Sequence, residues 1–269
     1  MASSKLGLQQ HTVVSPAEWL AARKQFLTKE KEFTRMRDEL SRQRRELPWK
    51  KVEKNYTFDG PSGKVTLADL FDKRGQLIVY HFMFGPGWKE GCPSCSMIAD
   101  QFDGFTTHLA NRGTTLAVVS RAPIADIEAF EKHMGWQFKW VSSFSNDFNR
   151  EYHISFTKDE MAAGKVNYNY EQAEFPAEEG PGASVFTNDA AGNIFHTYST
   201  YGRGLDILLG VYNFLDLVPQ GRDEEGLTFP MAWVRHHDRY QQGYFVDPTA
   251  TYSAAKKADA SCCSGEHHS

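Results

Sequence analysis

The sequence lacks the features that mark secreted, membrane-spanning and nucleic-acid-binding proteins. It has no run of 18 apolar residues, which excludes a membrane-spanning helix. Its 30 Lys and Arg residues nearly balance 34 Asp and Glu residues, so the formal net charge of −4 suits neither nucleic acid nor an anionic membrane as a partner. Residues 1–10 contain no apolar segment of the kind found in secretory signals. We therefore expect a cytoplasmic protein that binds neither nucleic acid nor membrane.

Cysteine is also scarce, with four residues in a chain of 269. A chain of this length can bury a large core without disulfide bonds, and the cytoplasm keeps thiols reduced. The four residues form two close pairs, Cys92 with Cys95 and Cys262 with Cys263. This arrangement favours chemical roles for cysteine over structural ones.

Residues 1–48 are predicted to form an N-terminal extension with one long helix at residues 15–47. Ser15 and Glu18 have the spacing of a capping box, and Pro48 ends the helical stretch. Large apolar side chains recur every seven residues, at Trp19, Phe26, Phe33, Leu40 and Leu47. We expect this apolar seam to pack on the body of the same chain, because Lys29 and Gln43 interrupt the second half of the heptad. Contact within a homodimer is the alternative.

Residues 49–218 are predicted to form an α/β domain. Its strongest strand covers residues 76–84, a continuous apolar run typical of the centre of a sheet. The other expected elements are a helix at 92–110, a strand at 114–120, a helix at 124–134, a hairpin from 184–187 and 193–198, and a helix at 205–217. This order predicts a central mixed sheet flanked by helices, parallel at its centre and antiparallel at one edge. We expect residues 219–247 to pack on the domain as a C-terminal extension and residues 248–269 to be a disordered tail.

The motif Cys92-Pro93-Ser94-Cys95 falls where the strongest strand gives way to the next helix. The first thiol of such a pair lies among unpaired N–H groups at the helix N-terminus, which stabilise a thiolate, and Lys89 could add positive charge. Cys95 is one helical turn away. The motif therefore predicts thiol–disulfide exchange in which Cys92 attacks and Cys95 resolves the mixed disulfide. Half of a structural zinc site is the alternative. Its further ligands would be Cys262, Cys263, His267 and His268.

Five segments carry a resemblance to a known family. They are GPGWKEGCPSCSMIADQFDG (85–104), VSRAP (119–123), MGWQFKWVSS (134–143), FHTYSTYGRGLD (195–206) and WVRHHDRY (233–240). Over about residues 19–240 the chain resembles a bacterial and fungal family of uncharacterised proteins with a thioredoxin-like fold, which are predicted to be dithiol–disulfide oxidoreductases. The resemblance implies that fold and that chemistry, and we expect no bound cofactor.

The thioredoxin-like fold also implies a cis-proline that faces the cysteine pair, and Pro181 matches its position. A trans proline in a glycine-rich loop is the alternative. The chain departs from thioredoxin in the Pro-Ser spacer and in Trp88, which does not directly precede Cys92, so reduction potential and partner choice stay open. The predicted partners are a cellular dithiol reductant and a disulfide or small-molecule substrate. The residues predicted to bind the substrate are Trp88, Lys89, Pro181 and Arg121.

A peroxiredoxin-like thiol peroxidase is the first competing function, since peroxiredoxins share this fold. Their nucleophilic cysteine follows a proline and a hydroxyl residue that bind the peroxide. Here Pro86 is six residues before Cys92 and no Ser or Thr lies between them. These departures make a thiol peroxidase the less favoured interpretation. Arg121 could still serve a thiolate or an anion, although a surface salt bridge is the commoner role for such a residue.

A copper or zinc protein is the second competing function. His81 falls in the strongest strand, His196 in the predicted hairpin, and His236, His237 and Asp238 lie downstream. A lone histidine in a strand is more often a core residue, so a metal site is the less favoured interpretation. The tail pair Cys262 and Cys263 could bind a soft metal or relay electrons, but we favour an incidental exposed tail.

Overall fold

The computed structural model describes residues 11–240. At its centre is an eight-stranded mixed sheet with the order β1-β10-β9-β4-β5-β6-β2-β3. Its strands are β1 (Lys50–Lys51), β2 (Thr57–Gly60), β3 (Gly63–Thr66), β4 (Gln76–His81), β5 (Thr114–Ser120), β6 (Lys139–Ser142), β9 (Gly182–Asn188) and β10 (Ile194–Tyr201). β4, β5 and β6 run parallel, whereas β9 is antiparallel to both β4 and β10. A separate small hairpin consists of β7 (Val166–Tyr168) and β8 (Glu171–Ala173).

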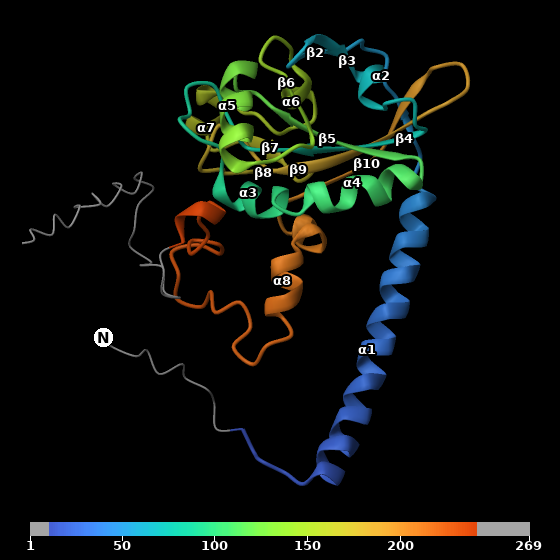
Figure 1. Cartoon of the computed structure of the whole chain (residues 1–269), viewed down its shortest axis with the longest axis vertical. Helices are drawn as coiled ribbons and strands as arrows, with labels where there is room; N and C mark the ends of the chain where they lie inside the picture. The colour runs from blue at the N-terminus through green and yellow to red at the C-terminus, as the bar shows by residue number, and fades with distance from the viewer. Residues whose placement is uncertain (1–10, 241–269) are drawn as a thin grey trace, which may run out of the picture.

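Helices lie on both sides of the sheet (Figure 1). Their bounds are α1 (Pro16–Arg45), α2 (Leu67–Leu70), α3 (Pro93–Ala99), α4 (Phe102–Asn111), α5 (Ile124–Met134), α6 (Phe148–Glu151), α7 (Lys158–Ala162) and α8 (Gly210–Leu215), with 3-10 turns at Gly202–Leu208 and His237–Arg239. The central strand β4 contributes apolar side chains to a core cluster on each side of the sheet. Leu77 and Val79 pack into a core cluster with α2 and α6, and Tyr80 joins the other cluster with α3, α5 and α8. A strand buried on both faces is therefore apolar throughout.

The connections of the central strands are those of the thioredoxin-like fold. α3 and α4 join β4 to the parallel strand β5, and the antiparallel hairpin β9–β10 leads to α8. The hairpin lies on the other side of β4 from β5, with Val79 between Ala117 and Ser184. The expected fold class, a central mixed sheet flanked by helices, is confirmed.

Several element boundaries differ from the predicted ones. The helix expected at 92–110 is divided into α3 and α4 at Asp100, whose carboxylate accepts a hydrogen bond from Trp136 Nε1 at 2.9 Å. The helix expected at 205–217 is a 3-10 turn followed by the shorter α8. Residues 157–181, for which no element was predicted, contain α7, β7 and β8. These elements are short, so their sequence periodicity is weak.

The long helix α1 is capped as predicted, because Ser15 and Glu18 form the capping box. The prediction that its apolar seam packs on the body is wrong for the described residues. No α1 residue is buried by the part of the chain that the structure describes, and Trp19 and Phe33 are 59% and 61% exposed. Figure 1 shows α1 extending away from the sheet. It meets the body near its C-terminal end, where the Arg44 guanidinium lies 4.8 Å from the centre of the Tyr198 ring.

The segment after α8 returns to the domain. Met231, Trp233 and Val234 join the core cluster that contains α3 and α5. None of the helices within residues 11–240 is both long and apolar enough to span a membrane. The predicted tail, with Cys262 and Cys263, lies outside the described residues.

Candidate functional site

The cysteine pair lies at the start of α3, after the loop that follows the carboxyl end of β4. Cys92 is the N-cap residue, with extended backbone angles, and Pro93 occupies the first helical turn. The Cys92 N–H donates to the Met83 carbonyl at 2.9 Å. The Cys92 carbonyl accepts from both the N–H and the hydroxyl of Ser96, each at 2.9 Å. These contacts fix the first cysteine at the end of the helix.

The two thiols are free and have different environments. Cys92 is half-buried, whereas Cys95 is 1% exposed. The Cys95 thiol donates a hydrogen bond that lowers the pKa of Cys92 to about 7, against the opposing effect of burial, and N–H groups of Cys95 and Ser94 add to the lowering. Burial raises the pKa of Cys95, and the neighbouring Cys92 raises it further. The pair therefore holds its negative charge on the more accessible sulfur.

Tyr80 lies behind the pair and was missed by the sequence analysis. Its side chain is buried at 1% exposure, and its hydroxyl has no hydrogen-bond partner that meets ordinary geometry among the described residues. The nearby hydroxyl lowers the Cys95 pKa against burial. Burial, followed by the nearby Cys95, raises the pKa of the Tyr80 phenol itself. The signal was present in strand alternation, since Tyr80 falls on the same face of β4 as Phe82, the face that α3 covers.

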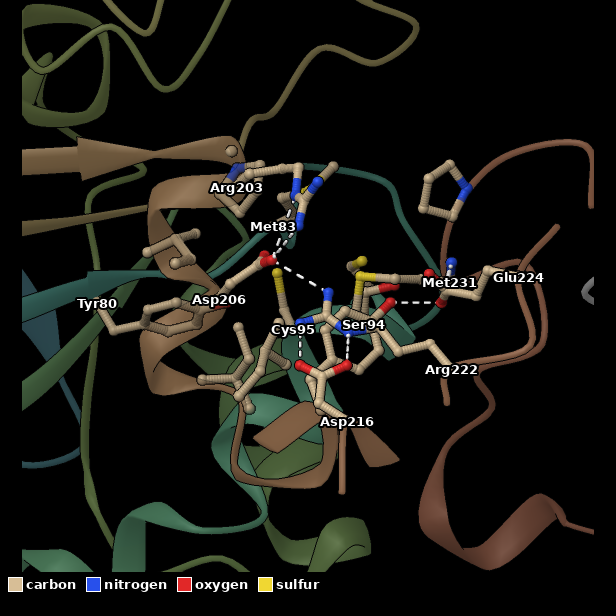
Figure 2. A pocket seen from close by; sticks show the side chains of 18 residues that line it. Tyr80, Met83, Ser94, Cys95, Arg203, Asp206, Asp216, Arg222, Glu224 and Met231 are labelled. Atoms are coloured by element: carbon tan, nitrogen blue, oxygen red, sulfur yellow. Dashed lines mark hydrogen bonds and ion pairs between the residues drawn. The ribbon is translucent and has the colours of Figure 1, made fainter. Parts of the chain in front are cut away.

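A cavity of about 690 Å³ opens beside the pair (Figure 2). Cys92, Ser94 and Cys95 line it together with apolar side chains from five parts of the chain. Those apolar side chains are Tyr80, Met83, Ile98, Pro181, Leu205, Leu209, Tyr212, Pro230 and Met231. Its position at the carboxyl end of β4 agrees with the usual place of sites in open α/β sheets.

One wall of the cavity carries charged side chains that form ion pairs with one another. Arg222 donates to both carboxylate oxygens of Asp216, at 2.8 and 2.7 Å, and to Asp206 at 3.1 Å. Its guanidinium lies over the Tyr212 ring at 3.9 Å. Glu224 accepts hydrogen bonds from Tyr212 and from the Met231 N–H. Figure 2 shows Arg222 between the two aspartates. This wall was not predicted from the sequence, because it joins two segments that share no motif.

Pro181 lines the cavity together with Cys92 and Cys95, but the predicted cis bond is wrong. Within residues 11–240 no peptide bond is cis, so the bond before Pro181 is trans. The Pro181 carbonyl accepts a hydrogen bond from the Tyr168 hydroxyl at 2.7 Å. Gly180 lets that ring approach, since a Cβ there would lie 2.9 Å from it. The tight approach of the loop is thus achieved with glycine and a trans bond.

Arg121 contacts the loop that carries Pro181 through an ion pair with Glu179. Its Nε donates to Glu179 Oε1 at 2.6 Å, and Ser155 Oγ donates to Glu179 Oε2 at 2.6 Å. Glu179 is 1% exposed and lies two residues before Pro181. Burial raises the pKa of Glu179, and Arg121 opposes this. Arg121 does not line the cavity and pairs with a buried carboxylate instead of a thiolate.

The two other predicted substrate-binding residues lie outside the cavity lining. Trp88 packs against the core cluster, and its indole covers Gly85, where a Cβ would lie 3.0 Å from Nε1. Lys89 is exposed. The groups that lower the pKa of Cys92 belong to Cys95 and Ser94. The site therefore brings Pro181 to the cysteines and leaves Trp88, Lys89 and Arg121 outside it.

The histidines considered as metal ligands lie in separate places. His81 is fully buried and bonds to Ser184 at 2.8 Å, while His196 bonds to Ser199 at 2.7 Å. His236 donates from Nε2 to the Gly91 carbonyl at 2.9 Å. No group of three His, Cys, Asp or Glu side chains within residues 11–240 converges on one point. The geometry gives the metal interpretation no support.

The segment around His236 contacts residues on either side of the cysteine motif. Arg239 donates to Glu90, with Nη1 at 2.6 Å from Oε2. His237 Nδ1 lies 2.7 Å from Asp100 Oδ1, just beyond α3. The C-terminal segment thus contacts residues on both sides of the cysteine motif. The sequence analysis expected packing here and did not identify these contacts.

Several solved structures are similar to the chain, and three of them are titled as a peroxiredoxin, a peroxidoxin and a putative thiol:disulfide interchange protein. A cysteine-to-serine mutant of peroxiredoxin Q from Xanthomonas campestris is 15% identical, with a TM-score of 0.40 over 59% of this chain and 90% of that one. Peroxidoxin BcpB from Mycobacterium tuberculosis is 11% identical, with a TM-score of 0.41 over 61% and 94%. A putative thiol:disulfide interchange protein DsbE from Chlorobium tepidum is 12% identical, with a TM-score of 0.38 over 61% and 97%. These values assign no activity to this chain.

No curated protein matches the chain. One family model does, over residues 8–240, and it describes bacterial proteins of unknown function. The match includes α1, the whole sheet, the cysteine motif and the C-terminal segment up to Tyr240. The chain belongs to this family, DUF899.

Proposed function

We propose that the protein is a thiol–disulfide oxidoreductase in which Cys92 is the nucleophile and Cys95 the resolving thiol. One observation carries the proposal: two free thiols lie together at the start of α3 and line one cavity, the first half-buried and the second 1% exposed. A thiol with a pKa near neutrality combines a large thiolate fraction with good nucleophilicity. The buried second thiol is placed to attack only a disulfide that forms on the first.

The reaction balances as two successive exchanges. The Cys92 thiolate attacks one sulfur of a substrate disulfide, a new S–S bond forms, and one substrate thiolate leaves. Cys95 then loses its proton and attacks the Cys92 sulfur, so that the second substrate thiolate leaves and a Cys92–Cys95 disulfide remains. The substrate has gained two electrons. A cellular dithiol reductant then reduces the Cys92–Cys95 disulfide and so restores two electrons to the pair. We propose that this cycle takes place in the reducing environment of the cytoplasm.

A thiol peroxidase receives less support from the geometry. Such an enzyme needs polar groups that hold and polarise the peroxide beside the thiolate. Arg121 is bound to Glu179, and Arg203 and Arg222 on the cavity wall are bound to carboxylates. The disulfide reaction needs no such group, since the leaving thiolate carries the charge.

Two variants test the proposal. Cys92→Ser should abolish disulfide turnover with a dithiol reductant, while Cys95→Ser should accumulate a stable mixed disulfide that mass spectrometry can identify. Ser94→Ala is the matched control, because it changes the motif without removing a thiol. Full turnover by Cys92→Ser would overturn the proposal.

We also propose that the chain acts as a homodimer. The exposed apolar seam of α1 supports this association.

A further inference from the structure

The cavity beside the cysteine pair has the size of a small-molecule site. Its volume of about 690 Å³ lies within the range of pockets that enclose most of a drug-sized ligand. Met83 and Ile98 line it near the thiols, Leu205 and Leu209 come from the segment after β10, and Met231 comes from the C-terminal segment. This volume and the mostly apolar lining suit a small substrate.

The charges on the cavity wall are unsuited to an anionic ligand. Arg222 is bound by Asp206 and Asp216, and Arg203 by Asp206. With Glu224, the wall has three carboxylates for two guanidinium groups, a net formal charge of −1. An anionic ligand would have to displace carboxylates from Arg222, which is 21% exposed. The ion pair of Arg203, which is 86% exposed, is screened by solvent and adds little to this barrier. The wall therefore selects against substrates such as glutathione disulfide, which carries several carboxylates.

We infer that the substrate is a neutral, largely apolar small-molecule disulfide that binds in this cavity beside Cys92. The inference rests on the proposed function and specifies its substrate class. The apolar body of the ligand packs between Ile98, Leu209 and Met231, and one of its sulfurs meets the Cys92 sulfur. The reaction is the two-step exchange described for the pair, so the ligand leaves as two thiols with two electrons gained.

Two aromatic disulfides of similar size test the substrate class. Dithiodipyridine is neutral, dithiobis(nitrobenzoate) carries two carboxylates, and the leaving thiol of each absorbs light. We expect the ratio of their rates with Cys92, neutral over anionic, to exceed the ratio with a free small thiol by about tenfold, equivalent to about 1.4 kcal/mol. A ratio equal to or below that of the free thiol would overturn the substrate class.

The variant Asp216→Asn releases one partner of Arg222 and should lower this selectivity several-fold by admitting the anionic disulfide. Asp38→Asn, which removes an exposed carboxylate on α1, is the matched control and should leave it unchanged. The proposed thiol–disulfide function is tested separately, by measuring whether the Cys92–Cys95 disulfide forms in a single turnover. A protein that forms this disulfide with both reagents without selectivity retains the function and loses the substrate class. One that forms it with neither loses both.

A second inference concerns α1 and is independent of the site. The apolar seam covers a helix of 30 residues, about 45 Å long, and no part of it is buried within residues 11–240. If the seam occupies position a of each heptad, the e positions are mostly basic and the g positions mostly acidic, with Glu30 at e and Gln25 at g as the exceptions. In a parallel pair of helices each g residue faces an e residue five positions on in the second copy. Three of the four such pairs are complementary, Glu18 with Arg23, Glu32 with Arg37, and Glu39 with Arg44, whereas Gln25 with Glu30 is not.

We infer that two copies of this chain associate through α1 as a parallel coiled coil. The charge pattern favours the parallel direction, because an antiparallel pair would set e residues against e residues, and three of the four, Arg23, Arg37 and Arg44, share one sign while only Glu30 differs. Lys29 and Gln43 occupy d positions. Polar residues at such positions lower stability while fixing register and the number of strands.

Light scattering coupled to gel filtration tests the association. The wild-type chain should have the mass of a dimer, Phe33→Glu should give a monomer, and Lys31→Glu, which changes charge off the seam, should remain dimeric. Phe26→Cys in a chain whose native cysteines are replaced by serine should form a disulfide between copies only if the helices are parallel. A monomeric wild-type chain, including one whose seam is covered by residues 241–269, would overturn the inference.

Discussion

His236 Nε2 donates a hydrogen bond to the carbonyl oxygen of Gly91, the residue directly before Cys92. The two residues are far apart in sequence, and the contact holds the C-terminal segment against the start of the cysteine motif. His236 is fully buried, its ring packs edge-on against Phe130, and burial lowers its pKa, so it stays neutral at physiological pH. The Nε2 proton that makes this hydrogen bond is held by the neutral ring in this tautomer and also by the charged ring, so the bond persists across the pH range in which Cys92 works.

Replacing His236 should weaken this support. His236→Ala removes a buried hydrogen bond and part of an aromatic contact, and we expect a loss of about 1–3 kcal/mol in the free energy of unfolding. Cys92 alkylation should change with it, because the Cys92 backbone is less restrained. Urea unfolding and iodoacetamide kinetics measure the two effects. His237→Ala, which changes a half-exposed neighbour, should show little of either; equal effects in both variants would contradict the specific role of His236.

The acidity of Cys92 predicts how its reactivity varies with pH. Alkylation of Cys92 should rise with pH around a midpoint of about 7, compared with an ordinary thiol value of 9.0. The hydrogen bond from Cys95 is the largest cause, so Cys95→Ala should move the midpoint upward. Ser94→Ala should move it less. A midpoint near 9 in the reduced wild-type protein would contradict the proposed thiolate.

The lowered pKa of Cys92 also determines the direction in which the free energy of unfolding changes with pH. Because the pKa of Cys92 is lower in the folded protein than in an unfolded chain, its ionisation stabilises the reduced fold at high pH. That contribution is fully present above about pH 9 and is lost as pH falls through about 7. Urea unfolding of the reduced protein between pH 6 and 9 should therefore show a smaller rise in stability for Cys92→Ser than for wild type.

Much of the centre of the fold could be predicted from the sequence. The apolar run of β4, the position of Cys92 and Cys95 after it, and the later hairpin specify a βαβ unit beside an antiparallel edge, because these signals are local. The contacts that complete the site are not local. Glu179 meets Arg121, His236 meets Gly91, and Arg222 meets Asp206 only once the chain has folded.

Two errors have identifiable physical causes. The seven-residue spacing in α1 predicts that its apolar face will be covered, but says nothing of which surface covers it, and the described body leaves Phe33 exposed. For Pro181 the isomer was carried over from the fold resemblance. The sequence contained the evidence for a different solution in Gly180 and Tyr168, but their approach depends on the packing of β7, which has no strong sequence pattern.

Tyr80 should act on the second chemical step. Its hydroxyl lowers the pKa of the buried Cys95 thiol, so Tyr80→Phe should slow resolution of the mixed disulfide, by about tenfold, without slowing attack by Cys92. Rapid-quench trapping with a disulfide substrate separates the two steps. Tyr168→Phe, which removes a hydroxyl that bonds to Pro181, is a control for general damage to the cavity. Equal slowing of both steps would mean that Tyr80 supports the fold alone.

The ion pair of Arg121 and Glu179 should dominate the stability of the Pro181 loop. Removing the guanidinium in Arg121→Ala leaves a carboxylate 1% exposed without its charge partner, which costs about 3–5 kcal/mol. The pKa of Glu179, already raised by burial, should rise further. A raised carboxyl pKa penalises the fold once the group would ionise, so the variant should lose stability as pH increases above the ordinary range of a glutamate.

Urea unfolding at several pH values measures this loss. Adding Glu179→Gln to Arg121→Ala should recover part of the stability and remove its pH dependence, because no buried charge remains. Arg74→Ala, which breaks the more exposed ion pair with Asp72, is the matched control and should cost about 1 kcal/mol or less. If Arg121→Ala were no more harmful than Arg74→Ala, the buried carboxylate would have to be satisfied by Ser155 alone.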